Sequence, residues 1–113
     1  MMAAEWIEIG RAEDIPVQGA RIVRTGRGDI ALFRTGDGRI LALLNRCPHR
    51  GGPLSEGIVH GSRVTCPLHN WVIDLETGAA QAPDRGCTPV LPVRVDGGIL
   101  RLGLSALPEP DHD

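Results

Sequence analysis

The chain has 113 residues, 42% of them hydrophobic and 23% charged, which suits one globular domain and excludes a two-domain enzyme or a disordered chain. Its longest uninterrupted apolar run, Ile40 to Leu44, is far shorter than the ~20 residues of a membrane-spanning helix. All 12 basic residues are arginine and the net charge is −2, which argues against nucleic acid or an anionic membrane as a partner.

Short strands joined by tight turns are predicted by the 15 glycines and 9 prolines, which interrupt segments of alternating apolar residues. The fold class is therefore all-β. Residues 29–34 should place Ile30 and Leu32 on one face and Ala31 and Phe33 on the other. In chain order, strands are expected at 6–9, 21–24, 29–34, 39–44, 63–66, 71–74, 92–96 and 99–104, with a short turn or single helical turn at 12–16.

The expected hairpin turns are Asp37-Gly38 and Gly97-Gly98. Glycines, prolines, cysteines and histidines gather between the two halves of this strand pattern. We therefore expect one domain over 4–105, with a loop-rich, metal-binding insert at about 45–83 and a flexible tail at 106–113.

The first residues of the chain give an indication of the cellular compartment. Met1 to Ile15 have no basic residue before Arg11 and no apolar stretch typical of a secretory signal. We therefore expect a cytoplasmic protein. Three cysteines in such a chain do not indicate a disulfide framework, so they are candidates for metal ligands.

Two short motifs carry the chemistry: Cys47-Pro48-His49 and Cys66-Pro67-Leu68-His69, separated by residues 50–65. Two thiolates and two imidazoles form a set of four ligands. Such a set holds either a tetrahedral zinc ion or a two-iron, two-sulfide cluster in which two histidines replace two cysteines on one iron.

The spacing favours the cluster. Zinc sites of this composition usually place two cysteines in one turn and two histidines in another, so that each turn grips one side of a single ion. Here each loop mixes the two ligand types, as a site with two irons requires. The prolines and the Gly51-Gly52-Pro53 run favour tight turns in which backbone amides approach the sulfurs.

With their spacing, these motifs resemble the Rieske [2Fe–2S] domain, and the similarity extends from Trp6 to Leu104. Within that family the chain most resembles the small subunit of assimilatory NAD(P)H-dependent nitrite reductase. The segments that carry this closer resemblance are Phe33-Arg34-Thr35, Asn45-Arg46-Cys47-Pro48-His49, Gly52-Pro53-Leu54-Ser55-Glu56-Gly57, His69-Asn70-Trp71 and Gly86-Cys87.

The resemblance implies an antiparallel β sandwich or barrel with one [2Fe–2S] cluster at its tip, held by Cys47, His49, Cys66 and His69. It also implies a one-electron carrier, serving a large nitrite reductase subunit with flavin, sirohaem and iron–sulfur centres in the reduction of nitrite to ammonium. The chain would then be the electron-transfer subunit of an oxidoreductase, without a substrate site of its own.

Two alternatives stay open. The ferredoxin of an aromatic-ring dioxygenase would share every ligand and differ in its partner. A zinc-stapled interaction module without redox activity is the alternative from another class.

The remaining candidates have both functional and plain structural interpretations. Leu54 and Leu68 are expected to form an apolar lid, Trp71 to shield the cluster or fill core, and Arg50 to contact an acidic partner. Cys87 is expected to be a buried small hydrophobe, and His60 and His112 to be solvated.

Overall fold

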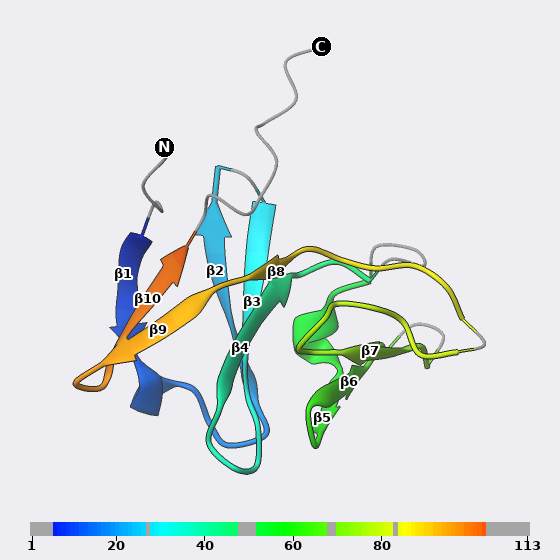
Figure 1. The fold of residues 1–113 in the computed structure, drawn as a ribbon, viewed down its shortest axis with the longest axis horizontal. Helices are drawn as coiled ribbons and strands as arrows, with labels where there is room; N and C mark the ends of the chain where they lie inside the picture. The colour runs from blue at the N-terminus through cyan, green and yellow to red at the C-terminus, as the bar shows by residue number, and fades with distance from the viewer. Residues whose placement is uncertain (1–5, 27, 48–51, 68–69, 83, 104–113) are drawn as a thin grey trace.

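The computed structural model describes residues 6–26, 28–47, 52–67, 70–82 and 84–103. Within them, the strands form three antiparallel sheets (Figure 1). The first sheet has the order β1-β10-β9, the second β2-β3-β4-β8 and the third β5-β6-β7. The strands are β1 (Trp6–Arg11), β2 (Ala20–Thr25), β3 (Gly28–Arg34), β4 (Ile40–Leu44), β5 (Ile58–His60), β6 (Arg63–Thr65), β7 (Val72–Asp74), β8 (Val90–Leu91), β9 (Val93–Asp96) and β10 (Ile99–Gly103).

Two short 3₁₀ helices complete the described elements, η1 (Ala12–Asp14) and η2 (Leu54–Glu56). The expectation of an all-β, antiparallel fold is confirmed. None of the helices in the described part of the chain has the length and apolar character needed to cross a membrane.

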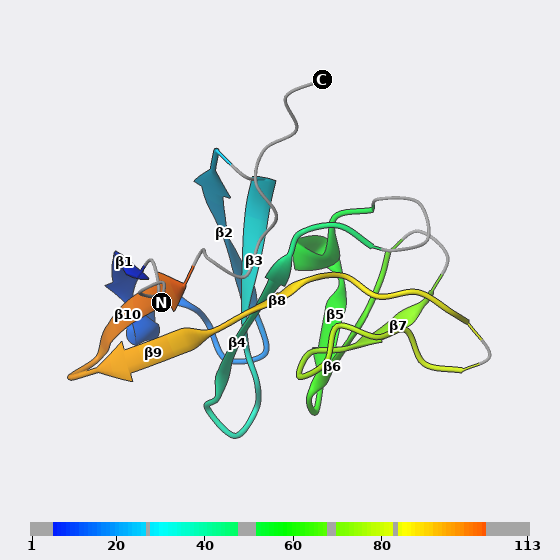
Figure 2. The ribbon, with the colours of Figure 1, turned by 45° about the horizontal axis from the view of Figure 1, so that its top comes forward.

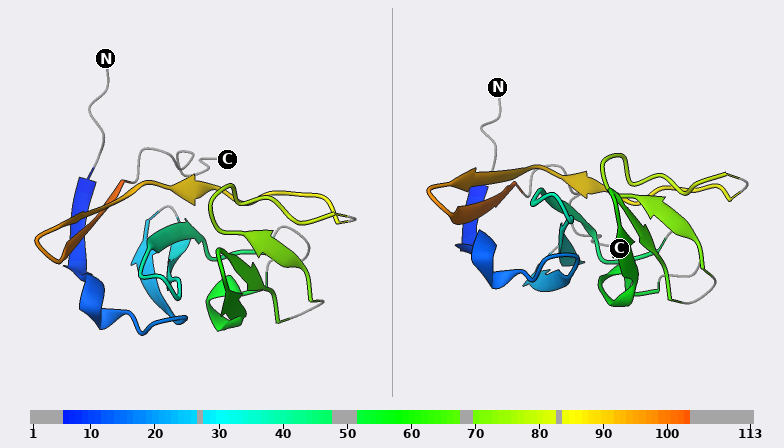
Figure 3. Two further views of the ribbon diagram at one scale, coloured as in Figure 1. Left: turned by 60° about the horizontal axis from the view of Figure 1, so that its bottom comes forward. Right: turned by 90° about the horizontal axis from the view of Figure 1, so that it is seen from below.

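The second sheet lies between the other two, as Figures 2 and 3 show from different directions. Its centre is the predicted hairpin of β3 and β4, with Phe33 opposite Leu41 across the pair. Gly38 closes the turn with a φ of 90°, a conformation open to glycine at little cost. Thr35, only 1% exposed, supports the turn because its Oγ1 accepts a hydrogen bond from the Arg39 amide at 3.0 Å.

Strand β3 is buried on both faces, which explains its nearly continuous apolar sequence. Ala31 and Phe33 face one cluster of buried side chains, and Ile30 and Leu32 face another. The alternation predicted for residues 29–34 is thus confirmed. We call the first cluster the cysteine core; its members are Ala31, Phe33, Leu43, Cys47, Leu54, Val59, Val64, Cys66, Ile73 and Leu75. The second is the scaffold core, formed by Ile15, Ile30, Leu32, Ala42, Leu91, Leu100 and Leu102.

Two strands were not anticipated from the sequence. β5 has three residues between Gly57 and Gly61, and its Ile58 is 71% exposed, so it carries little apolar periodicity. β8 has two residues and depends on pairing with β4. Both are too short for local sequence to specify and exist because a neighbouring strand is available.

A surface ion pair joins the β3–β4 turn to the end of the third sheet. Arg39 Nη1 lies 3.1 Å from Glu76 Oε2, and Arg39 Nε lies 3.2 Å from Asp37 Oδ2. The pKa of Asp37 is held below its ordinary value, first by the hydrogen bond from Thr35 and further by Arg39. Because these groups are solvent-exposed, the ion pairs contribute little to stability.

Candidate metal centre

The first cysteine-bearing loop begins directly after β4. The Leu44 amide donates to the Pro89 carbonyl at 3.0 Å, and the Asn45 amide donates to the Asp29 carbonyl at 2.8 Å, so the chain leaves the sheet in a defined direction. Cys47 follows and is 2% exposed. Its amide donates to the carbonyl of Gly52 at 2.8 Å, which closes the loop.

The second loop connects β6 and β7 and is closed in the same manner. The Cys66 amide donates to the carbonyl of Trp71 at 2.7 Å, and the Asn70 amide donates to the carbonyl of Cys66 at 3.2 Å. Asn70 has a φ of 60°, the left-handed conformation that asparagine tolerates better than most residues. In both loops, therefore, the cysteine amide bonds the carbonyl five positions later.

The strands expected at 63–66 and 71–74 are each shorter by one residue than predicted. β6 ends at Thr65 and β7 begins at Val72. Cys66 and Trp71 thus form the base of the loop rather than the ends of the strands.

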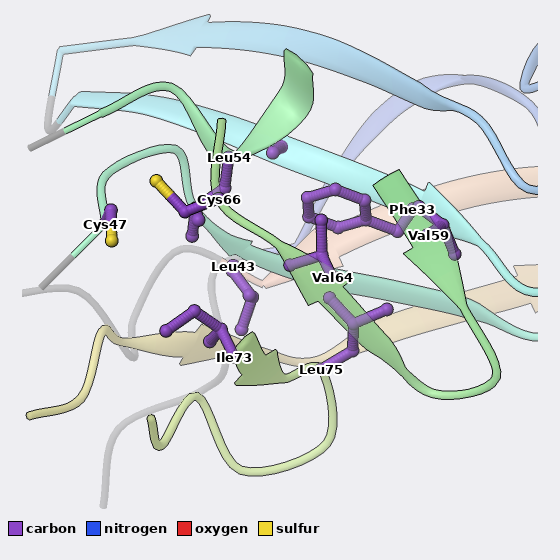
Figure 4. Close-up of a cluster of buried hydrophobic side chains, with 10 residues drawn as sticks. Phe33, Leu43, Cys47, Leu54, Val59, Val64, Cys66, Ile73 and Leu75 are labelled. Carbon is purple, nitrogen blue, oxygen red and sulfur yellow. The ribbon is translucent and has the colours of Figure 1, made fainter. Parts of the chain in front are cut away.

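Both thiols belong to the cysteine core and lie at the same end of it. Figure 4 shows Cys47 and Cys66 together at that end, with Phe33 and Val59 at the other. Cys66 is 1% exposed, and neither cysteine forms a disulfide within the described part of the chain. Sulfur is a soft ligand, and a thiolate held in apolar surroundings is stabilised when a metal compensates its charge.

A close backbone contact brings the two loops together. Gly57, which caps η2 after the first loop, lies against the carbonyl of Thr65, the residue before Cys66. A Cβ at Gly57 would collide with that carbonyl oxygen and lie 2.9 Å from Val64 Cγ2. Only glycine permits this approach.

Two of the four expected ligands, His49 and His69, lie outside the described residues, as do Arg50, Leu68 and His112. The part of the chain that the structure describes contains no group of three or more histidines, cysteines and carboxylates able to hold a metal ion. The structure therefore brings together the two cysteines, and the histidine ligands remain a prediction.

The structure also describes three other residues that the sequence singled out, Leu54, Trp71 and His60. Leu54 is fully buried in the cysteine core, and Trp71 is half-buried and packs against it. His60 ends β5 and is exposed as expected, with Nε2 2.8 Å from Thr65 Oγ1.

The expectation that Cys87 is buried is wrong. The residue is exposed and forms an isolated bridge with Ala79 at the margin of the third sheet. Its apolar character suggested burial, but the neighbouring Thr88 takes the buried position instead, 5% exposed.

Sequence reasoning did not single out Gly57, Asn70 or Asn45 as individual contributors to the site. Gly57 does not have a positive φ, so its backbone conformation does not require glycine. Its contact with the carbonyl of Thr65 does. Asn70 offered a weak signal, because asparagine after a compact Cys-x-x-His motif is compatible with a left-handed turn.

Comparison with known proteins gives a family match and several relatives. The sequence profile of the Rieske [2Fe-2S] domain matches residues 5–92. The anthranilate 1,2-dioxygenase ferredoxin subunit of Burkholderia cepacia is 36% identical over 96 residues, covering 84% of this chain and 88% of that protein.

Two solved structures have the same fold. A chain assigned as an NADH-dependent nitrite reductase small subunit from Mycobacterium tuberculosis superposes with a TM-score of 0.80 at 25% identity, covering 89% of this chain and 96% of its own. A chain in the complex of reduced oxygenase and oxidized ferredoxin of carbazole 1,9a-dioxygenase superposes with a TM-score of 0.78 at 29% identity, covering 87% and 92%.

We predict that Gly57→Ala forces the two cysteine loops apart. Overpacking of this kind costs about 1–3 kcal/mol, so the thermal midpoint should fall. In the metal-free protein Cys47 and Cys66 should react faster with a thiol reagent, while the exposed Cys87 serves as an internal fast reference.

The matched control is Gly26→Ala, because nothing lies within 4 Å of a Cβ at that position. Equal thermal midpoints and equal thiol reactivities for Gly57→Ala and Gly26→Ala would contradict the role given to Gly57.

Proposed function

The chain belongs to the Rieske [2Fe–2S] domain family, and on this basis we propose that it is a one-electron carrier whose cluster is held by Cys47, His49, Cys66 and His69. The domain binds a [2Fe–2S] cluster. The observation that carries the proposal is the meeting of two buried cysteine side chains, from loops far apart in the sequence, at one end of a single core.

The described residues fit such a cluster. Cys47 and Cys66 supply thiolates, and Leu54 and Trp71 limit the access of water from the side of the core. A [2Fe–2S] cluster with mixed cysteine and histidine ligation accepts and releases one electron, at a potential above that of all-cysteine plant-type clusters.

Three backbone amides of the two loops already have an acceptor. The amides of Cys47, Cys66 and Asn70 donate to backbone carbonyls. Any amide that donates to the cluster sulfurs must therefore come from other residues of the loops. Hydrogen bonds to the sulfurs are one means by which a protein sets the potential.

The proposal assigns no substrate to this chain. A Rieske oxygenase also needs mononuclear iron on two histidines and a carboxylate. His60 is exposed on β5 and contacts Thr65, which does not suit it to such a triad. In this proposal the carrier passes its electron to a separate enzyme.

Two classes of partner are supported by different observations. The identity of 36% to a dioxygenase ferredoxin subunit supports the oxygenase of an aromatic-ring dioxygenase system as the partner. The superposition on a nitrite reductase small subunit supports the large subunit of a nitrite reductase as the partner. In both classes this chain serves as an electron-transfer subunit.

Electron transfer to isolated partners tests the function. The dithionite-reduced protein, freed of excess reductant, is mixed without oxygen with either partner from the same cells, and reoxidation is followed by visible absorbance. We expect rapid reoxidation by one of the two partners. Reoxidation by neither, in a protein that holds its cluster, would refute both partner classes.

The ligand assignment predicts the effect of single substitutions. Cys47→Ser, His49→Ala, Cys66→Ser and His69→Ala should each abolish the cluster, because each removes one of four ligands. Cys87→Ser should keep it, since Cys87 is exposed and lies outside the cysteine core.

The measurement is the iron and acid-labile sulfide content of protein made with ample iron, expected at about two of each per chain in the unaltered protein. The reduced protein should also give the low-average-g EPR signal of mixed ligation. Colourless protein containing stoichiometric zinc would support the zinc-stapled module instead.

The potential should lie near the lower end of the Rieske range, about −150 mV. High-potential members of the family add a disulfide between the loops and hydroxyl donors to the cluster. Here Gly52 and Leu68 occupy the disulfide positions, Asn70-Trp71 follows His69, and the chain contains no tyrosine. Without those donors the reduced, more negative cluster is stabilised less.

Redox titration followed by EPR measures this value. A midpoint above about +100 mV, well within the upper part of the Rieske range, would contradict the tuning argument.

A further inference from the structure

Asn45 is bonded through both its backbone and its side chain. Its amide donates to the Asp29 carbonyl at the start of β3, at 2.8 Å. Its side-chain Oδ1 accepts a hydrogen bond from the amide of Ser55, also at 2.8 Å, across ten positions of sequence. The residue therefore joins the central sheet to η2.

This side-chain bond spans the first cysteine-bearing loop. Asn45 precedes Cys47 by two positions, and Ser55 lies in η2 beside Leu54, which is fully buried in the cysteine core. The Cys47 amide bond to Gly52 closes the loop on the inside. The bond between Asn45 and Ser55 closes it a second time on the outside.

We infer that Asn45 is a positioning residue that holds together the two ends of the loop that contains Cys47 and so controls how fast the cluster is lost. Without its Oδ1, the partly buried amide of Ser55 has no acceptor, which raises the free energy of the closed loop. Local opening then becomes more frequent and exposes Cys47, which is otherwise 2% exposed.

The second loop shares the backbone closure of the first, from the cysteine amide to the carbonyl five positions later, and Asn70 adds a left-handed conformation. The first loop has the longer connection between its supporting elements, from the end of β4 to η2, so a side-chain bond across its ends has more chain to restrain.

The inference rests on the proposed function, because it takes Cys47 as a cluster ligand. The two can fail separately. If the ligand assignment is wrong, Cys47→Ser keeps its cluster; if the inference is wrong, the ligand variants behave as proposed but Asn45 variants release the cluster at the normal rate.

The experiment compares the rate of cluster loss in iron-loaded protein. Excess iron chelator is added at fixed pH and salt, and the decay of the visible absorbance is recorded alongside the thermal midpoint. Asn45→Ala should lose its cluster about tenfold faster, the factor that corresponds to one ordinary hydrogen bond. Asn45→Asp retains a carboxylate oxygen as acceptor and should stay within about twofold of the unaltered protein.

Two control variants separate positioning from general stability. Ser55→Ala keeps the backbone amide that Asn45 binds and removes a hydroxyl that has no partner among the described residues, so its rate should be unchanged. Thr35→Val removes an acceptor of a backbone amide at the other end of β4. It should lower the thermal midpoint without accelerating cluster loss.

Three results would overturn the inference: a normal rate for Asn45→Ala, an equally fast rate for Asn45→Asp, or the same acceleration in Thr35→Val. If Asn45→Ala is obtained without a cluster, its rate of cluster loss cannot be measured, and Asn45→Asp becomes the test of the inference. Normal loading and a normal rate of release in Asn45→Asp support the role of the acceptor oxygen, and failure to load refutes it.

Discussion

The β3–β4 hairpin is buried on both faces, and the packing of the other two sheets follows from that burial. Each fully buried leucine or isoleucine in the hairpin contributes about 1.5–3 kcal/mol of hydrophobic stabilisation. One face packs against β10 through Leu100 and Leu102, and the other against the third sheet through Val64 and Ile73. The candidate metal centre is not an addition to this core, because Cys47 and Cys66 are members of it.

This placement gives the two cysteines a dual role. Their side chains are packed as apolar groups, while the loops that carry them are closed by backbone hydrogen bonds of the same pattern. Gly57 and Asn45 set how closely the loops approach and how firmly the first is held. An electron carrier benefits from such rigidity, because ligands that are already in position need little rearrangement when the charge of the cluster changes.

Sequence reasoning succeeded where the chemistry is local. The two Cys/His motifs identified the family and the cofactor, and the apolar pattern of residues 29–34 identified a strand and assigned its two faces. It failed for β5 and β8, which are short and depend on neighbouring strands, and for Cys87, whose exposure reflects the path of the chain beside Ala79. It also left open whether a dioxygenase ferredoxin or a nitrite reductase subunit is the better description, since that depends on a partner's surface.

Local sequence was enough to predict the all-β class and to reveal the two Cys/His motifs with their spacing, because alternating apolar residues, turn-forming residues and such motifs extend over only a few positions of chain. By contrast, the folded structure was needed to show that Cys47 and Cys66 share one end of a core, that Gly57 must lack a side chain and that Asn45 bonds Ser55. The physical reason is that close packing and buried hydrogen bonds join segments far apart in the chain, and local sequence carries no record of which segments will meet.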